Sequence, residues 1–269
     1  MKASMFVHPT FDPVALHITE KFGIHWYGLM YLIGFMAFLG LGKWQIKHRT
    51  WHGWTAQMLD DALFFGALGV ILGGRLGYVV FYQPAHFMQH PLEIAAIWQG
   101  GMSFHGGFLG VLVAMWIFSK KYQVKWLNIM DFVAPLVPIG LGAGRMGNFI
   151  NGELWGRPTN SEYGMIFPQV DLVARHPSQL YEFFLEGIVL FLVLWIYSAK
   201  PRATGAISAL FLIGYGSFRF LVEYTRQPDE YLGLLKMGLS MGQWLSLPMI
   251  LLGVWMFWWA NRASIFKFL

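Results

Sequence analysis

Residues 144–157 read GRMGNFINGELWGR and place two arginines, two asparagines and a glutamate among four glycines, directly after the apolar run FVAPLVPIGLGA. A guanidinium offers planar, bidentate donors that suit a phosphate group. Glycines permit tight turns and a close approach of the backbone to a ligand, and exposed amides in such turns bind anion oxygens. The pattern therefore predicts an anion site, formed by Arg145, Asn148, Asn151, Glu153 and Arg157.

A second constellation lies in GYGSFRFLVEY, where Tyr215, Arg219 and Glu223 are spaced four residues apart. This spacing places the three side chains on one face of a helix. Charged side chains facing lipid cost about 2.5 to 3.5 kcal/mol each at the centre of a membrane helix, so the face is expected to look into the protein. A structural ion pair between Arg219 and Glu223 is the alternative, and it leaves Tyr215 unexplained.

Two further residues are candidates for proton transfer or substrate contact. His105 lies in GGMSFHGGFLG, and histidine titrates near neutral pH and can act as a general base. A lone histidine near a membrane is more often structural, but the expected position of His105, level with the arginine motif, favours a catalytic role. Tyr27 in IHWYGLMYL opens an apolar run at the same level, with a place in an interfacial aromatic belt as the alternative.

Arg75 is a third intramembrane arginine, in the sequence GVILGGRLGY. Gly69, Gly73 and Gly77 recur around it every four residues, which is typical of a helix face that packs closely against a neighbour. Arg75 is therefore expected to be at least partly structural.

The elements that must position these residues are membrane helices. The 269-residue chain is 56% hydrophobic and only 12% charged, against about 25% charged residues in soluble proteins. The sequence predicts an all-α polytopic membrane protein with a single domain over residues 1–269 and a polar segment at about 149–181. Seven spans are expected from apolar runs of roughly 20 residues, at 27–43, 61–82, 106–119, 131–148, 182–198, 204–224 and 241–260.

Basic residues predict the orientation of these spans. One set of alternating loops holds ten Lys and Arg residues, among them Lys43, Lys120 and Lys200, and the other set holds six over longer segments. By the positive-inside rule the first set is cytoplasmic, so the N-terminus and the arginine motif lie outside and the C-terminus inside. The net charge of +5 then reflects topology, and nucleic-acid binding is not expected.

The residue types also exclude several chemistries. The chain has no cysteine, so it has neither disulfides nor a thiol nucleophile of its own. No metal-ligand motif is present, and neither a metal nor a cofactor is expected. Several arginines and one possible base at the outer membrane surface suit direct displacement on an anionic phospholipid. A lipid or small-anion transporter, which would place its polar groups nearer the midplane, and a structural membrane subunit remain as alternatives.

The pattern GRMGNFINGELWGR, together with HWYGLMY, SFHGG, RHPSQLYE and YGSFRFLVEYTRQPD, resembles bacterial prolipoprotein diacylglyceryl transferases, in the same order from about residue 23 to residue 250. The resemblance implies a seven-span enzyme of the bacterial inner membrane whose active face is periplasmic. It implies transfer of the diacylglyceryl group of phosphatidylglycerol to the lipobox cysteine of a prolipoprotein signal peptide, with release of glycerol phosphate.

The resemblance also implies roles for individual residues. His105 matches an essential histidine and Arg145 a phosphate-contacting arginine, and the remaining signature positions are Asn148, Glu153, Gly156 and Arg157. Tyr27, Tyr215, Arg219 and Glu223 match positions implicated in activity. The resemblance leaves open which group removes the proton of the lipobox cysteine thiol. His105 is one candidate, and the other is a cationic pocket around Arg145 and Arg219 that lowers the pKa of the thiol.

Overall fold

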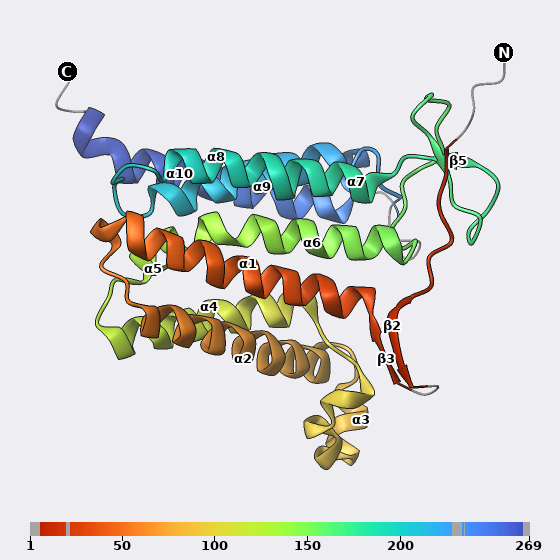
Figure 1. Ribbon diagram of the computed structural model, residues 1–269, viewed down its shortest axis with the longest axis horizontal. Helices are drawn as coiled ribbons and strands as arrows, with labels where there is room; N and C mark the ends of the chain where they lie inside the picture. The colour runs from red at the N-terminus through yellow and green to blue at the C-terminus, as the bar shows by residue number, and fades with distance from the viewer. Residues whose placement is uncertain (1–5, 20–21, 228–232, 234, 266–269) are drawn as a thin grey trace. The chain divides into compact units, whose positions relative to one another are not determined.

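A computed structural model describes residues 6–19, 22–227, 233 and 235–265 of the chain (Figure 1). The chain divides into two compact units, each with its own internal packing. The first unit comprises Met1–Leu41 and Asp131–Leu269, and the second comprises Gly42–Met130. The arginine motif and the constellation around Arg219 both belong to the first unit, whereas Arg75 and His105 belong to the second.

Helices occupy all seven of the expected apolar runs. Their bounds are α1 Trp26–His48, α2 Ala56–Phe81, α4 Phe104–Tyr122, α5 Trp126–Val133 continuing through a 3₁₀ turn into α6 Val137–Ile150, α7 Ser178–Glu182 continuing through a π-helix into α8 Leu190–Tyr197, α9 Ala206–Val222 and α10 Met241–Ile265. Within the described residues, five of these stretches are long and apolar enough to cross a membrane, and α9 is apolar but shorter. The chain is thus a mainly helical membrane protein, and the number of seven spans stays a prediction.

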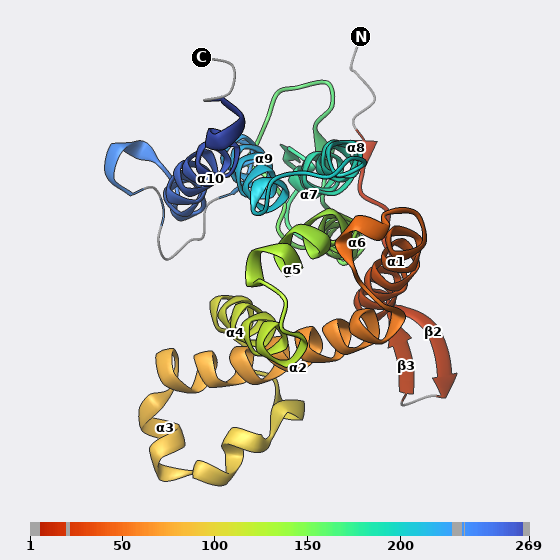
Figure 2. The ribbon, with the colours of Figure 1, turned by 90° about the vertical axis from the view of Figure 1, so that its left-hand side faces the viewer.

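The second unit is built on the close packing of α2 against α4 (Figure 2). A Cβ atom on Gly73 would lie 2.3 Å from the carbonyl oxygen of Gly106, and one on Gly69 would lie 2.7 Å from that of Gly110. These contacts confirm the expected small-residue face, which lets two helix backbones touch. Thr55 and Ser103 accept hydrogen bonds from the N-terminal amides of α2 and α4 and thereby cap them. The short helix α3, Pro84–Gln89, and two 3₁₀ turns connect the two long helices.

In the first unit, α6, α7, α8, α9 and α10 run alongside one another (Figure 1). The apolar core between them includes Ala134, Leu190, Leu194 and Ile207.

The fourth expected span is divided by the 3₁₀ turn Ala134–Leu136, which contains Pro135. Proline lacks the amide that a continuous helix requires and is tolerated in the first turn of a new one. The break is therefore a local consequence of the sequence.

A buried carboxylate fixes the beginning of α9. Asp131 lies at 6% exposure on α5 and accepts hydrogen bonds from the backbone amides of Gly205 and Ser208, at 2.6 and 2.8 Å. The Ser208 hydroxyl donates a third bond, at 2.6 Å. These amides are among those that a helix leaves unsatisfied at its N-terminus, and a negative charge is favourable there. The position of α9, and hence of the arginine near its other end, is tied to the fourth apolar stretch.

Short strands were not predicted from the sequence, and all of them lie in the first unit. β1 Phe6–Val7 pairs in parallel with β4 Met165–Ile166, which pairs antiparallel with β5 Ala174–Arg175. β2 Val14–Thr19 and β3 Phe22–His25 form a hairpin that leads into α1. The first sheet joins the N-terminal segment to the polar segment at 149–181, and most of that segment has no regular structure.

The glycine contacts predict opposite outcomes for two alanine substitutions in α2. Gly73→Ala places a methyl group against backbone atoms of α4 that cannot rotate away, so the helices must separate, at a cost of about 1 to 3 kcal/mol. Gly66→Ala is the matched control, because a Cβ at Gly66 meets nothing within 4 Å. Thermal unfolding of the detergent-solubilised protein should show a lower midpoint for Gly73→Ala and an unchanged or higher one for Gly66→Ala. Equal midpoints would contradict the close helix contact.

Candidate active site

Six charged side chains of the first unit gather where α6, α7 and α9 lie together. This arginine–glutamate cluster consists of Arg145, Glu182, Glu186, Arg219, Glu223 and Arg226. The three arginine side chains are 13 to 17% exposed and the glutamates 6% or less. Charges this deeply buried are tolerated only when they are paired. The cluster therefore accounts for the presence of arginines in apolar helices.

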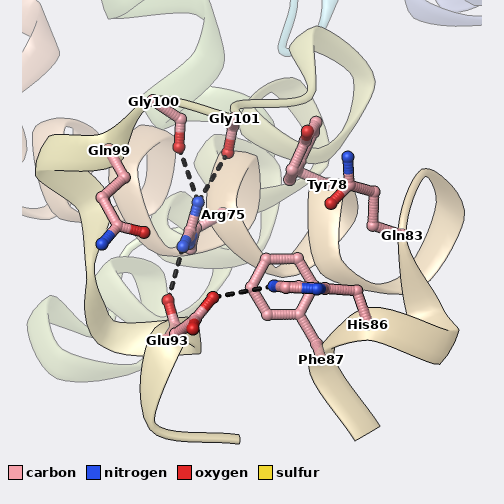
Figure 3. Close-up of a pocket in the computed structure, with 9 residues that line it drawn as sticks. All are labelled: Arg75, Tyr78, Gln83, His86, Phe87, Glu93, Gln99, Gly100 and Gly101. Carbon is pink, nitrogen blue, oxygen red and sulfur yellow. Dashed lines mark hydrogen bonds and ion pairs between the residues drawn. The ribbon is translucent and has the colours of Figure 1, made fainter. Parts of the chain in front are cut away.

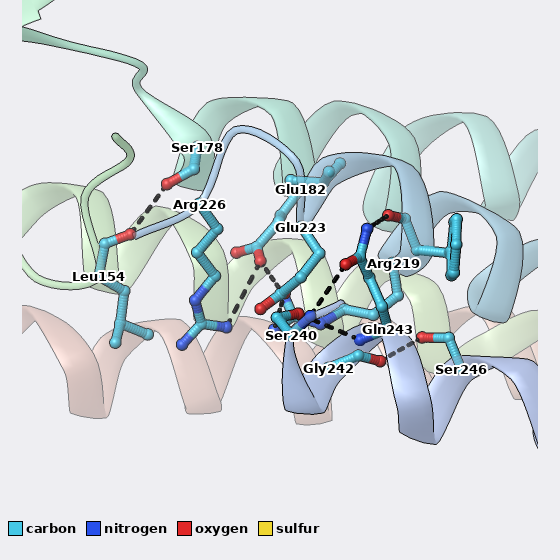
Figure 4. Close-up of polar contacts among 12 residues, drawn as sticks. Leu154, Ser178, Glu182, Arg219, Glu223, Arg226, Ser240, Gly242, Gln243 and Ser246 are labelled. Atoms are coloured by element: carbon cyan, nitrogen blue, oxygen red, sulfur yellow. Dashed lines mark hydrogen bonds and ion pairs between the residues drawn. The ribbon is translucent and has the colours of Figure 1, made fainter. Parts of the chain in front are cut away.

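Glu182 is the carboxylate to which all three arginines are directed. Its Oε2 lies 3.1 Å from Nε of Arg145. Its Oε1 forms an ion pair with Nη1 of Arg219 and lies 3.9 Å from Nη1 of Arg226 (Figure 4). Burial, followed by the positive charge of Arg219, lowers the pKa of Arg226 from its ordinary value. One glutamate, the last residue of α7, thus holds guanidinium groups from α6, from α9 and from the segment after α9.

Glu223 links this cluster to the beginning of α10. Its Oε2 lies 2.8 Å from Nη2 of Arg219, so the ion pair that the sequence offers as an alternative for these two residues is present. A Cβ atom on Gly242 would lie 2.7 Å from the same carboxylate oxygen, so the Glu223 side chain rests directly on the first turn of α10. Ser240 and Gln243 bond each other's backbone amides in a reciprocal cap of that turn (Figure 4). A helix N-terminus favours a negative charge, which stabilises Glu223 there.

Tyr215 is the third member of the face predicted on α9. Its ring stacks on Phe211 at 5.8 Å between centroids and packs against the apolar core. The phenol also lies within electrostatic range of Glu186, Arg145 and Arg219. Tyr215 and Arg219 on α9, and Glu223 directly after its last residue, therefore face the same interior, as their spacing indicates.

Two asparagines and a glutamate of the glycine-rich motif form a second polar group, at the end of α6. The Asn148 amide donates to Oε2 of Glu153 at 3.3 Å, and the Asn151 amide donates to Oε1 at 3.2 Å. The backbone amide of Glu153 in turn donates to the carbonyl of Asn148 at 2.9 Å. Asn148 is buried at 7% exposure, whereas Glu153 is exposed. The carboxylate thus lies at the surface with both oxygens held by amides.

Gly156 and Arg157 lie between two other segments of the chain. The amide of Gly156 donates to the carbonyl of His176 at 2.9 Å, and that of Arg157 donates to the carbonyl of Thr225 at 2.8 Å. Nε of Arg157 donates to the carbonyl of Arg226, also at 2.8 Å. The motif is thereby connected to the segment that carries Arg226. This makes Gly156 and the backbone of Arg157 structural supports of the cluster.

Tyr27 lies against the same helix as Arg145. A Cβ atom on Gly147 of α6 would lie 2.9 Å from the Tyr27 ring, so the ring is in contact with the helix backbone. Tyr27 also makes an edge contact with Tyr31, with ring centroids 5.2 Å apart. Its side chain is 36% exposed. Tyr27 therefore belongs to the first unit and borders the glycine-rich motif.

In the second unit, Arg75 is a structural residue. Its guanidinium donates to the carbonyl oxygens of Glu93, Ile94, Gly100 and Gly101, at 2.5 to 3.3 Å. Arg75 lines a small polar pocket, whose volume is about 120 Å³. The residues around this pocket are drawn in Figure 3. In the same pocket a hydrogen bond with His86 lowers the pKa of Glu93. Arg75 thus organises the loop that precedes α4.

His105 is the second residue of α4, and its side chain is exposed. It lies two residues after the capping residue Ser103, whose backbone amide donates to the carbonyl of Gly74 on α2 at 2.8 Å. The helix that carries His105 is therefore firmly held within its own unit. A catalytic role for His105 stays a prediction.

Three members of the cluster were not selected from the sequence: Glu182, Glu186 and Arg226. The two glutamates are four residues apart in YEFFLEG, inside an apolar run. A charge inside an apolar run is costly whether it belongs to an arginine or to a glutamate, so this spacing indicates a buried face that needs charged partners. Arg226 had no such signal, because it lies beyond the end of α9, and only the fold of the following segment brings it to Glu182.

Comparison with known proteins agrees with the resemblance seen in the motifs. A family model described as prolipoprotein diacylglyceryl transferase matches residues 13–259. A protein of Methylobacillus flagellatus named phosphatidylglycerol–prolipoprotein diacylglyceryl transferase is 69% identical over 255 residues, covering 94% of this chain and 97% of that protein. The protein of the same name from Nitrosomonas europaea is 62% identical over 259 residues, covering 96% of this chain and 93% of its own length.

The contacts of Gly156 predict that it cannot carry a side chain. A Cβ there would lie 2.4 Å from the carbonyl oxygen of His176 and 2.5 Å from that of Thr225, so Gly156→Ala must displace one of the two segments. Gly144→Ala is the matched control, because a Cβ at Gly144 meets nothing within 4 Å. We expect Gly156→Ala to lower the thermal midpoint and to expose the 149–181 segment to limited proteolysis. A parent-like cleavage pattern would show that the two backbone bonds are dispensable.

Proposed function

Since the chain belongs to the family of prolipoprotein diacylglyceryl transferases, we propose that it transfers the diacylglyceryl group of phosphatidylglycerol to a prolipoprotein. The acceptor is the thiol of the lipobox cysteine in the signal peptide of the prolipoprotein. The chain itself has no cysteine, so the reacting thiol comes only from this substrate.

The reaction is a displacement at carbon. The thiolate attacks the glyceryl carbon that carries the phosphate, a carbon–sulfur bond forms, and the carbon–oxygen bond to phosphate breaks. The oxygen keeps the electron pair, so a phosphodiester with one negative charge leaves as glycerol phosphate with two. The site must therefore stabilise a charge that grows on the leaving group.

The observation that carries the proposal is the arrangement of the arginine–glutamate cluster. Arg145 and Arg219 come from different helices, are largely buried, and are fixed by the carboxylate of Glu182. Donors held in place before the reaction stabilise a developing anion without a cost of reorganisation. We assign to these two arginines the binding of the phosphate and the stabilisation of its second charge. The substrate site around the two arginines is proposed to be lined by Tyr27, Tyr215, Asn148, Asn151 and Glu153.

Removal of the thiol proton has two candidate routes. In the first, His105 accepts the proton as a general base. In the second, the positive charges of Arg145 and Arg219 lower the pKa of the thiol, which is about 8.5 when unperturbed, and favour the thiolate.

The proposed topology has seven spans in the bacterial inner membrane, with the N-terminus and the active face in the periplasm. Its support is the distribution of charge along the helices of the first unit. Arg145, Arg219 and Glu182 lie near the ends of their helices that adjoin the polar segment 149–181. Lys200 and Arg202 lie in the connection at the opposite ends, between α8 and α9. Counted over the loops of the whole sequence, ten Lys and Arg residues lie on the proposed cytoplasmic side and six on the other, as the positive-inside rule requires.

The activity is tested by incubating the purified protein with phosphatidylglycerol vesicles and a lipobox peptide, followed by mass spectrometry. The peptide should gain the mass of one diacylglyceryl group, and glycerol phosphate should appear in equal amount. A peptide with serine in place of the lipobox cysteine is the control and should remain unmodified. An unchanged cysteine peptide with an active reference enzyme in parallel would contradict the proposed function.

Arg145→Lys tests the role of the guanidinium. Lysine keeps the positive charge near Glu182 but loses the planar fork that a phosphate can bind in two places. We expect the rate to fall by a factor of about 10² to 10³, the usual effect of removing one such donor, while expression and the thermal midpoint stay near those of the parent. Lys200→Arg is the control, since that residue lies at the opposite end of the helices. Turnover within a few-fold of the parent would make Arg145 a packing residue.

A further inference from the structure

Glu186 is the carboxylate that packing does not explain. Its side chain is fully buried at 0% exposure, and neither of its oxygens has a hydrogen-bond partner among the described residues. Among the other buried carboxylates of the first unit, Glu182 is held by Arg145 and Arg219, and Asp131 by the beginning of α9. Oε2 of Glu223 also makes no hydrogen bond, but it lies 2.8 Å from Nη2 of Arg219, which is closer than the 3.5 Å of the ion pair that Glu186 makes. A buried polar group that lacks such partners is costly. An apolar side chain at this position would serve stability better.

The ion pair of Glu186 is formed with the guanidinium of Arg145. Oε2 of Glu186 lies 3.5 Å from Nη2 of Arg145, which is longer than a hydrogen bond, while Oε2 of Glu182 lies 3.1 Å from Nε of the same group. Two carboxylates from one helix thus face the Nε–Nη2 edge of one guanidinium. Among the described ion pairs of Arg145, Nη1 takes no part.

The local backbone places both carboxylates at this edge. Glu186 belongs to the π-helical segment Phe183–Val189, which directly follows Glu182. Such wide turns are rare and occur frequently at functional sites. The neighbouring Gly187 touches α6, since a Cβ there would lie 2.9 Å from Cα of Gly142. The π-helix is therefore pressed against the helix that carries Arg145, one turn before that residue.

We propose that Glu186 is a positioning residue of the transfer reaction: with Glu182 it occupies the Nε–Nη2 edge of Arg145 and so directs the remaining N–H groups of the guanidinium toward the phosphate. This inference rests on the proposed function, because it concerns the phosphate site of that reaction. Glu186 acts only through Arg145 and does not itself contact the substrate. A misplacement of the order of 1 Å in a catalytic group costs about a hundredfold in rate, which sets the size of the expected effect.

The test is a double-mutant cycle between Glu186 and Arg145, with phosphatidylglycerol vesicles and a lipobox peptide as substrates. Glu186→Gln keeps the volume of the side chain but removes its charge, and we expect kcat/KM to fall about 10- to 100-fold. The inhibition constant of added glycerol phosphate should change as well, because the phosphate site is altered. In the Arg145→Lys background, Glu186→Gln should cost less than threefold, since the group that it positions has already been lost.

Two controls separate positioning from folding. Glu162→Gln, at an exposed residue of the polar segment, should keep parent kinetics in both backgrounds. Glu186→Asp keeps the charge on a shorter side chain and should retain more activity than Glu186→Gln. A merely structural role would lower the active fraction and the thermal midpoint and leave KM and the inhibition constant unchanged, which would overturn the proposal. Parent-like kinetics for Glu186→Gln, or fully multiplicative effects in the double mutant, would overturn it too. An inactive parent would instead contradict the proposed function.

Discussion

The first unit depends on the neutralisation of charge inside apolar helices. Three arginines and three glutamates meet at one place, and Glu182 is shared by all three arginines. Because an unpaired charge in such surroundings is costly, helices α6, α7 and α9 can take only an arrangement that brings these partners together. Asp131 acts in the same way at the far end of α9, where it replaces the missing partners of the helix amides. Ionic and polar pairing therefore fixes α9 at both ends, and the apolar core fills the space between.

Glycine supplies the second condition, which is close approach of backbones. Gly142 meets Gly187 where α6 crosses the π-helix, and Gly156 fits between the carbonyls of His176 and Thr225. The first contact brings Arg145 within reach of two carboxylates, and the second holds the segment that carries Arg226. In both cases a methyl group would move a charged partner by a distance that an ion pair tolerates poorly. The glycines near the motif are thus required by the charges that they bring together.

Much of this organisation could be read from the sequence, and the exceptions have physical reasons. Apolar runs are a local property, so all seven helical stretches were located, and the four-residue spacing on α9 correctly placed Arg219 beside Glu223. The pairing of β1 with β4 was missed because it joins residues 6–7 to residues 165–166, and no local pattern encodes such a contact. Glu182 and Glu186 are different: they lie in an apolar run, and the cost of burying a charge, which points to the arginines, points to these glutamates as well. The role of Arg226 depends on a turn after α9 that sequence periodicity does not describe.

The balance of charges also bears on what the site is for. Three carboxylates stand beside three guanidinium groups in the cluster, so the arginines are partly compensated and a phosphate is not held by their full positive charge. The carboxylates reduce the affinity of the arginines for any anion, including the departing glycerol phosphate, while they fix the direction of each guanidinium. An enzyme gains rate only from interactions that are stronger in the transition state than before or after it. Arginines whose charge is largely balanced by glutamates, but whose direction is fixed, favour the transition state in this way. The second phosphate charge appears beside them only as the carbon–oxygen bond breaks.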